Sequence, residues 1–200
     1  METHVRTWRV AARARLKQER QELSATDRRF LTEAIARNLD RVFERLTCGT
    51  LGIYWPIKGE FDIRAWAAGI SARKRCRLAL PVVIREHAPL EYWRWHSGDE
   101  MVRGFWGIMV PKTPVAVAPD VVIAPLLGFS DLYRLGYGGG YFDRTLAVLQ
   151  PKPKAIGIGA ESGRMQGFVP QSHDIPMDVI VTEAGVYRGP TMAEGSHEHQ

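Results

Sequence analysis

Cysteine is scarce in this chain of 200 residues: only Cys48 and Cys76 are present. They form no CxxC or Cys/His motif, which excludes a zinc site or redox dithiol of the usual spacing. We expect two reduced, partly buried thiols, typical of a cytoplasmic protein. The chain also lacks a signal-type apolar segment and any run of 18 apolar residues. We therefore expect a cytoplasmic protein without a membrane partner.

Charge of neither sign dominates. Lys and Arg total 27 against 22 Asp and Glu, a formal net charge of +5. The hydrophobic share of 45% and the charged share of 24% are ordinary for a globular protein with a sizeable core. The positive excess favours anionic partners such as nucleotides, polyglutamates or nucleic acid, although it can also serve solubility alone.

Strand and helix patterns alternate along the chain. The patterns predict four helices, at about 8–22, 24–49, 63–70 and about 141–149. Thr7 is the expected N-cap of the first helix, and Ser24 and Gly49 are the expected N-cap and end of the second. Apolar segments predict strands at 50–56, 76–83, 90–96, 121–129, 155–160 and 178–183. We expect an α/β fold, a single-domain three-layer sandwich with a mixed, largely parallel central sheet flanked by helices.

The remaining segments complete this expected organisation. The continuous apolar run 121–129 predicts a central strand covered on both faces. The proline-dotted stretch 101–119 is expected to be a loop over the site. We expect the domain to span residues 1–189 and the tail 190–200 to be disordered.

The first predicted helix carries a row of cations. Arg9, Arg13, Lys17 and Arg20 are spaced i, i+4, i+8 and i+11, so they share one face. A charged face of this kind is usually solvated, and this segment alone favours that interpretation. The alternative is a row of cations that binds phosphate.

The stretch "RLGYGGGYFDR", Arg134 to Arg144, joins the predicted central strand to a helix. Ligands of open α/β sheets bind outside the carboxyl ends of strands, and a glycine-rich helix N-terminus suits phosphate. The loop lacks the Lys-Ser/Thr of a Walker A motif and the G-x-G-x-x-G of a dinucleotide fold. Arg134 suits phosphate charge and Asp143 suits Mg²⁺. Asp143 would equally suit the first turn of a helix for structural reasons.

This stretch closely resembles the signature of the 5-formyltetrahydrofolate cyclo-ligase family, approximately R-L-G-x-G-x-G-Y-Y-D. The similarity includes the basic helix, "YWPIKGEFDIR" at 54–64 and "PQSHDIPMDVIVTE" at 170–183. The resemblance implies an enzyme that uses ATP and Mg²⁺ to convert 5-formyltetrahydrofolate to 5,10-methenyltetrahydrofolate, releasing ADP and phosphate. The implied route is phosphorylation of the formyl oxygen followed by attack of N10.

The resemblance also implies roles for individual residues. Arg134 and Asp143 would be catalytic, and Asp143 would bind the metal. The implied ATP-binding residues are Arg9, Arg13, Arg134, Gly136, Gly138, Gly139, Gly140, Tyr141 and Phe142. Glu60 would accept hydrogen bonds from the pterin, and the aromatic candidates for its walls are Tyr54, Trp55, Trp93 and Trp106. His173 and Asp174 match a family motif, but we expect them to form a structural turn.

Several positions depart from the family pattern. The segment before Arg134 is one residue shorter, with Asp131 as a shifted carboxylate, and Val110 and Gly163 stand where other residues are usual. We expect these differences to lie near the substrate pocket. They leave open a diverged paralogue that binds nucleotide or a folate-like ligand without this activity. A basic nucleic-acid-binding module is a third alternative, although no RRM, KH or helix-turn-helix signature supports it. We expect a monomer whose partners are folate and ATP, and no nucleic acid partner.

Overall fold

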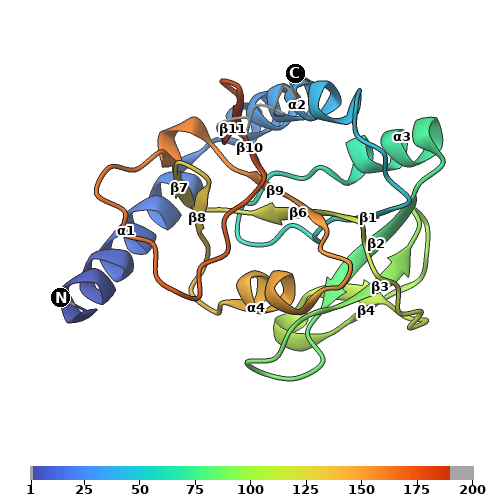
Figure 1. Ribbon diagram of the computed structural model, residues 1–200. Coiled ribbons are helices and arrows are strands. Elements are labelled where there is room, and N and C mark those ends of the chain that lie inside the picture. Colours follow the sequence, from blue (N-terminus) through green and yellow to red (C-terminus); the bar gives the residue numbers. More distant parts are fainter. Residues whose placement is uncertain (1, 190–200) are drawn as a thin grey trace, which may run out of the picture.

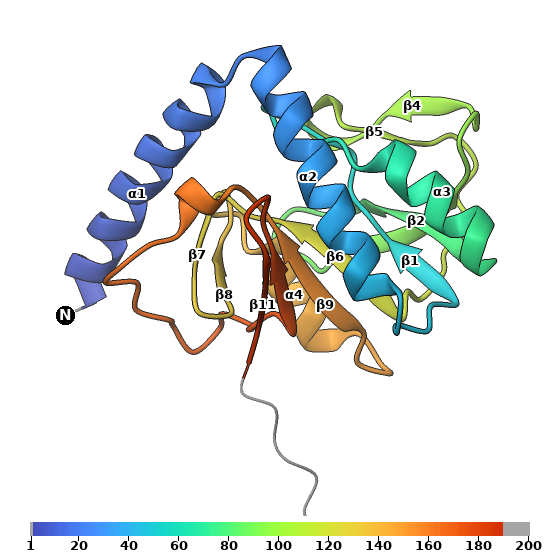
Figure 2. The ribbon, with the colours of Figure 1, turned by 90° about the horizontal axis from the view of Figure 1, so that it is seen from above.

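The computed structural model describes residues 2–189 and contains a seven-stranded mixed sheet (Figures 1 and 2). Its strands are β1 (Thr50–Gly52), β2 (Arg77–Val82), β3 (Glu91–Trp95), β6 (Val121–Pro125), β9 (Lys154–Ile158), β10 (Val179–Val181) and β11 (Val186–Arg188). Their order in the sheet is β11-β10-β9-β6-β1-β2-β3. The five inner strands are parallel, and the two edge strands are antiparallel to their neighbours.

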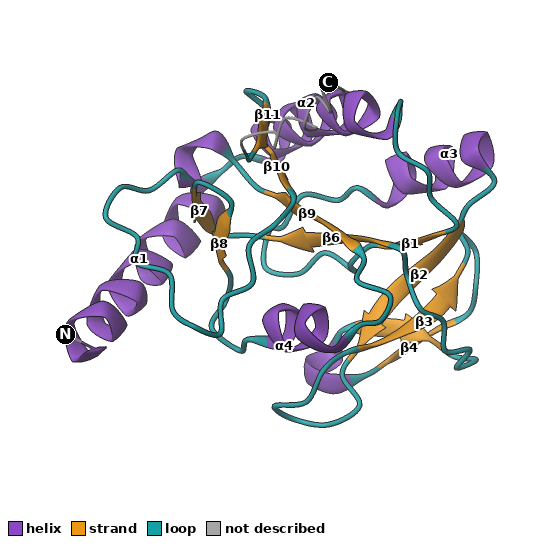
Figure 3. Ribbon diagram, viewed as in Figure 1, coloured by secondary structure: helices purple, strands orange, loops and turns teal. Residues whose placement is uncertain are grey.

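Helices cover both faces of this sheet (Figures 1 and 3). The α-helices are α1 (Glu2–Glu22), α2 (Ala25–Phe43), α3 (Arg64–Lys74) and α4 (Tyr141–Val148), and the 3₁₀ turns are η1 (Phe105–Gly107) and η2 (Glu161–Gly163). Helices α2 and α3 lie on one face and α4 lies on the other. The predicted three-layer α/β architecture with a mixed, largely parallel sheet is confirmed.

The core is divided by the sheet. On one face, Leu39 and Phe43 of α2 pack with Ile123 of β6. On the other face, Leu146 of α4 packs with Val122. Adjacent residues of β6 thus enter opposite cores, which is why this strand consists of apolar residues on both faces. The prediction that this segment supplies the central strand is confirmed.

Helix α1 packs beside the sheet and not over it (Figure 2). Its partner is the hairpin of β7 (Gly128–Ser130) and β8 (Tyr133–Leu135), which lies outside the main sheet. Ala12 and Leu16 form a small third cluster with Leu127 and Leu135. This contact brings the basic face of α1 to the glycine loop that follows β8.

Two helix boundaries differ from the prediction. Helix α1 begins at Glu2, so Thr7 is not its N-cap; the Thr7 hydroxyl donates to the Thr3 carbonyl at 3.0 Å. Helix α2 ends at Phe43 and not near Gly49. Its N-cap is confirmed, because the Ser24 hydroxyl accepts the Asp27 N–H at 3.0 Å. A capping side chain is a local signal, whereas these other ends depend on packing.

Short strands were missed by the sequence analysis. The stretch 101–119 was predicted to be a loop, but it contains β4 (Met101–Arg103) and β5 (Met109–Pro111) around η1. The run 121–129 is divided between two strands, β6 and the start of β7. The Leu126 N–H makes the last bond to the sheet, to the Ile158 carbonyl, and the chain then leaves the sheet for the β7–β8 hairpin. Three-residue strands carry too little alternation to be recognised.

Two further expectations concern the rest of the chain. The predicted disordered tail, residues 190–200, lies outside the described residues. Within residues 2–189, no helix combines the length and apolar character that crossing a membrane requires.

Candidate functional site

A cavity of about 410 Å³ lies beyond the carboxyl ends of β2 and β6. This is the edge at which open parallel sheets bind ligands. Its principal lining residues are Arg9, Arg13, Trp55, Lys58, Glu60, Trp106, Arg134, Gly136, Tyr137, Gly138, Gly139, Gly140, Tyr141, Phe142, Asp143, His173 and Asp174. Segments from five parts of the chain therefore surround one space, and most of the predicted site residues are among them.

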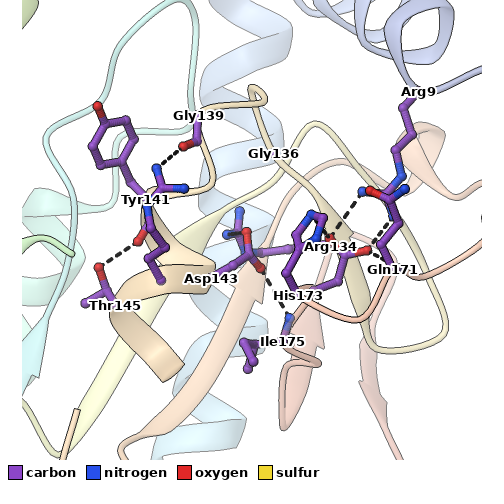
Figure 4. A network of polar contacts seen from close by, with 12 residues as sticks. Arg9, Arg134, Gly136, Gly139, Tyr141, Asp143, Thr145, Gln171, His173 and Ile175 are labelled. Carbon is purple, nitrogen blue, oxygen red and sulfur yellow. Dashed lines mark hydrogen bonds and ion pairs between the residues drawn. The ribbon is translucent and has the colours of Figure 1, made fainter. Parts of the chain in front are cut away.

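An ion pair between Arg134 and Asp143 lies at the base of the glycine loop (Figure 4). Strand β8 carries Arg134 and the first turn of α4 carries Asp143, and their Nη2 and Oδ2 atoms are 2.8 Å apart. The side chains are only 4% and 16% exposed. The other oxygen of Asp143 accepts the Ile175 N–H at 3.3 Å. The pair is thus fixed in a partly dry setting, where charges act strongly on a bound ligand.

Arg134 is not fully satisfied by this pair. Its Nε is buried and has no hydrogen-bond partner among the described residues. Its Nη1 lies so close to Gly136 that a Cβ there would be 2.6 Å away. A guanidinium with an unused donor at the wall of a cavity is suited to an anion.

The basic face of α1 is not solvated, so that sequence interpretation was wrong. Arg9 donates to the Asp174 carboxylate and to the Val169 carbonyl at 2.9 Å. Arg13 Nε donates to the Gly136 carbonyl at 2.9 Å. Arg20 donates to the Tyr137 hydroxyl at 3.2 Å. Three cations on one face of α1, one turn and two turns apart, therefore bridge this helix to the loops around the cavity.

This arrangement is electropositive. Burial, with the neighbouring Arg9 as a second cause, lowers the pKa of the Arg13 guanidinium. A cation whose charge is disfavoured by its surroundings gains most when an anion binds beside it. The same region contains a second ion pair, in which burial opposes ionisation of Asp174 but hydrogen bonds from Arg9 and the Gln171 N–H hold its pKa below the usual value.

The glycine loop presents free backbone donors to the cavity. Gly138 and Gly140 have φ of 102° and 65°, in the left-handed region that side chains disfavour. Gly140 precedes α4, and no side chain caps the helix there. Among the described residues, no hydrogen bond uses the N–H of Gly138, Gly139 or Gly140. Successive free N–H groups at a helix N-terminus form an anion-binding concavity.

Glu60 is buried at the other side of the cavity, with only 6% of the residue exposed. Its Oε2 accepts the Ile57 N–H at 2.9 Å. Burial raises its pKa from 4.5 to about 7, and this hydrogen bond and the charges of Arg20 and Lys58 offset the effect only in part. A buried acceptor that titrates near neutrality suits a polar, uncharged ligand group with N–H donors.

The four aromatic candidates have different positions. Trp55 and Trp106 line the cavity, and Arg64 stacks on Trp55 with its Cζ 4.0 Å from the ring centre. Tyr54 does not line it: this residue is 3% exposed and donates its hydroxyl to the Phe61 carbonyl at 2.6 Å. The prediction that Tyr54 forms a ligand wall is therefore wrong, because its side chain belongs to the core. Trp93 is also outside the cavity.

The segments that line the cavity all lie within the part of the chain that matches a known protein family. A model of the 5-formyltetrahydrofolate cyclo-ligase family matches residues 5–183. The chain belongs to the 5-formyltetrahydrofolate cyclo-ligase family. The prediction that it is an enzyme of this family is confirmed, and the resemblance in the glycine loop reflects a match over most of the chain.

Relatives of the cyclo-ligase family include proteins from several bacteria. The 5-formyltetrahydrofolate cyclo-ligase of Escherichia coli (strain K12) is 31% identical over 151 residues, covering 69% of this chain and 80% of that protein. The one from Mycoplasma pneumoniae is 28% identical and covers 86% of this chain and 97% of that protein. The solved 5,10-methenyltetrahydrofolate synthetase of Aquifex aeolicus superimposes with a TM-score of 0.77 at 30% identity, covering 96% of this chain and 99% of that one.

Asp174 is a residue of the site that the sequence analysis undervalued. It does form the expected turn, since its Oδ2 accepts the Gln171 N–H at 2.7 Å. It also lines the cavity, and among residues 2–189 no other carboxylate pairs with Arg9. The cyclo-ligase motif in 170–183 was the available signal. Tyr137 and Lys58 also line the cavity, and nothing in the local sequence distinguished them.

The departures from the cyclo-ligase pattern mostly lie away from the cavity, contrary to expectation. Asp131 is exposed in the two-residue turn between β7 and β8, with φ of 50°, so it does not replace a site carboxylate. Val110 and Gly163 are buried, and neither lines the cavity. The shortened segment therefore forms a two-residue hairpin turn outside the cavity. Phe142, which stands where the signature quoted above has its second tyrosine, does line the cavity.

Proposed function

We propose that this protein converts 5-formyltetrahydrofolate to 5,10-methenyltetrahydrofolate in an ATP- and Mg²⁺-dependent reaction that releases ADP and phosphate. The observation that carries the proposal is a single cavity with phosphate-type donors on one side and the buried Glu60 on the other. Such a cavity can hold two substrates in contact, which is the main requirement of a phosphoryl transfer.

The ATP phosphates are assigned to the side formed by α1 and the glycine loop. Gly138 to Gly140, whose N–H groups make no hydrogen bond within residues 2–189, line this space together with Arg13 and Arg134. Arg9 is already paired with Asp174, so it contributes by sharing its donors between that carboxylate and a phosphate oxygen. Tyr141 and Phe142 contribute the first backbone N–H groups of α4, which point toward a ligand at the helix N-terminus.

The folate is assigned to the side that contains Glu60. A pterin carries adjacent N–H donors, and a buried carboxyl that already holds one backbone N–H retains acceptor capacity for them. Trp55 and Trp106 supply flat apolar walls for the ring. With the pKa of Glu60 at about 7, the carboxylate form that accepts both donors is present at neutral and higher pH.

The chemistry follows from the weakness of a formamide as an electrophile. Transfer of the γ-phosphoryl group to the formyl oxygen releases ADP and converts that oxygen into a phosphate leaving group. N10 then attacks the formyl carbon, loses its proton, and phosphate departs as the ring closes. Arg134 stabilises the negative charge on the transferred phosphoryl group. The Arg134–Asp143 ion pair fixes this guanidinium before substrate arrives.

The side chains at the phosphate end fit a magnesium ion. Within residues 2–189 no three acidic, His or Cys side chains gather into a metal cluster. Mg²⁺ commonly takes only one or two carboxylates and completes its shell with water and phosphate oxygens. Asp143 and Asp174 line the cavity and would be the carboxylates for this role, each with an oxygen lone pair left besides its ion pair with Arg134 or Arg9. The ion would neutralise phosphate charge there.

The test is the absorbance of methenyl-folate after mixing purified protein with 5-formyltetrahydrofolate and Mg²⁺, with and without ATP. An ATP-dependent rise is expected. No rise, with ATP still bound by calorimetry, would replace the proposal with the diverged paralogue. The tight hairpin that motivated that alternative lies outside the cavity, so the structure gives it little support.

A further inference from the structure

Arg144 occupies an unfavourable place for a cation. It lies in the first turn of α4, where the helix dipole favours negative charge. Its guanidinium folds back and donates to the Gly139 carbonyl, and its Cζ lies 5.1 Å from the centre of the Tyr141 ring. A residue that opposes a local rule and makes a specific contact is expected to serve a function.

The contact with Gly139 determines how the next peptide group points. In a planar trans peptide the carbonyl and the following N–H point in opposite directions. A carbonyl of Gly139 held by Arg144 therefore turns the Gly140 N–H the other way. Figure 4 shows Gly139 beside Tyr141 and apart from Arg134 and Arg9. The N–H of Gly140 is one of the free donors at the N-terminus of α4.

The glycine run cannot fix this orientation by itself. Three successive glycines, Gly138 to Gly140, restrict the backbone little, so alternative peptide orientations cost little energy. An external contact is needed to select one of them.

Tyr141 gives Arg144 a fixed support. The Tyr141 hydroxyl accepts the His87 N–H at 3.2 Å, and its ring meets the Trp106 ring edge-on with centres 5.4 Å apart. The ring is therefore held by two other segments while the guanidinium stacks on it. Arg144 is pinned between this ring and the Gly139 carbonyl.

We propose that Arg144 is a positioning residue that fixes the Gly139–Gly140 peptide and thereby aims the Gly140 N–H at a phosphate of ATP. This inference rests on the proposed function, since it specifies how the same loop binds its nucleotide. Arg13 makes a similar contact with the Gly136 carbonyl, but it also faces the cavity as a ligand. Arg144 therefore offers the cleaner test.

The experiment compares Arg144→Ala and Arg144→Lys with the wild type. Calorimetry measures binding of Mg·ATP and of inorganic tripolyphosphate, and kinetics measure KM for both substrates. For Arg144→Ala we expect affinity for both phosphate probes to fall about tenfold, the value of one charge-assisted hydrogen bond. KM for the folate should change less than twofold, because Arg144 does not contact that side of the cavity. Arg144→Lys should restore part of the affinity, because an ammonium can still bind the carbonyl.

The control is Arg29→Ala, which removes an exposed arginine from α2, away from the cavity. It should leave both affinities unchanged. The melting temperature of Arg144→Ala should change little, because loss of the contacts with Gly139 and Tyr141 is offset by removal of a cation from a helix N-terminus. Unchanged phosphate affinity, or an equal loss for phosphate and folate, would overturn the inference. If the wild type itself fails to bind ATP, the proposed function fails instead.

Discussion

The buried carboxyl of Glu60 makes stability depend on pH in a direction that can be worked out. Burial raises its pKa to about 7 in the folded protein, whereas the unfolded chain titrates near 4.5. Below pH 4.5 the carboxyl is protonated in both states, so its raised pKa does not affect the free energy of unfolding. As the pH rises toward 7, only the unfolded state can ionise freely, so the free energy of unfolding falls. Above 7 the full penalty is present.

The magnitude follows from the two pKa values. Their difference, at about 1.4 kcal/mol for each pKa unit, corresponds to about 3 kcal/mol. Glu60→Gln removes the charge but keeps the shape and an oxygen that can accept the Ile57 N–H. The variant should therefore match the wild type near pH 4.5 and exceed its stability by up to about 3 kcal/mol at pH 8.

The assay is urea unfolding of both proteins at intervals from pH 4.5 to 8.5. Glu33→Gln is the matched control, because Glu33 is an exposed glutamate on α2 and its replacement should change the free energy of unfolding by less than about 1 kcal/mol. A stability difference for Glu60→Gln that stays constant with pH would refute the reasoning. The same variant should weaken folate binding more than ATP binding, and equal losses would argue against a contact between Glu60 and the pterin.

Three further substitutions test other parts of the site. Arg134→Ala should lower kcat by roughly 10²-fold or more in the methenyl-folate assay while the protein stays folded, and near-normal turnover would remove Arg134 from the mechanism. Asp174→Ala should lower the free energy of unfolding by about 3 kcal/mol in urea, because it leaves Arg9 buried without its counter-charge; a loss under about 1 kcal/mol would contradict this account. Gly140→Ala should lower the free energy of unfolding by about 1–2 kcal/mol and raise KM for ATP. The reason is that φ of residue 140 is 65° and the new Cβ would lie 3.0 Å from Arg144 Nη1; an unchanged stability and an unchanged KM would disprove this backbone constraint.

Local signals were sufficient for several features. The N-cap at Ser24 was predicted correctly because its hydrogen bond joins residues three apart. The central strand was predictable because both faces of β6 are covered, which demands a continuous apolar run. The resemblance of the glycine loop and the basic helix also sufficed to identify the family.

The sequence by itself thus determined the α/β class, the family, and the segments from which the site is built. Only the tertiary structure decided which polar groups meet. Packing of α1 against the β7–β8 hairpin converts a face that would be solvated on an isolated helix into a row of bridges. The same packing pairs Arg9 with Asp174 across 165 positions of the chain. Tyr54 and Trp55 are adjacent and both aromatic, yet one is in the core and the other in the cavity. Contacts between distant segments leave no periodic trace in the sequence, because their geometry exists only once the chain has folded.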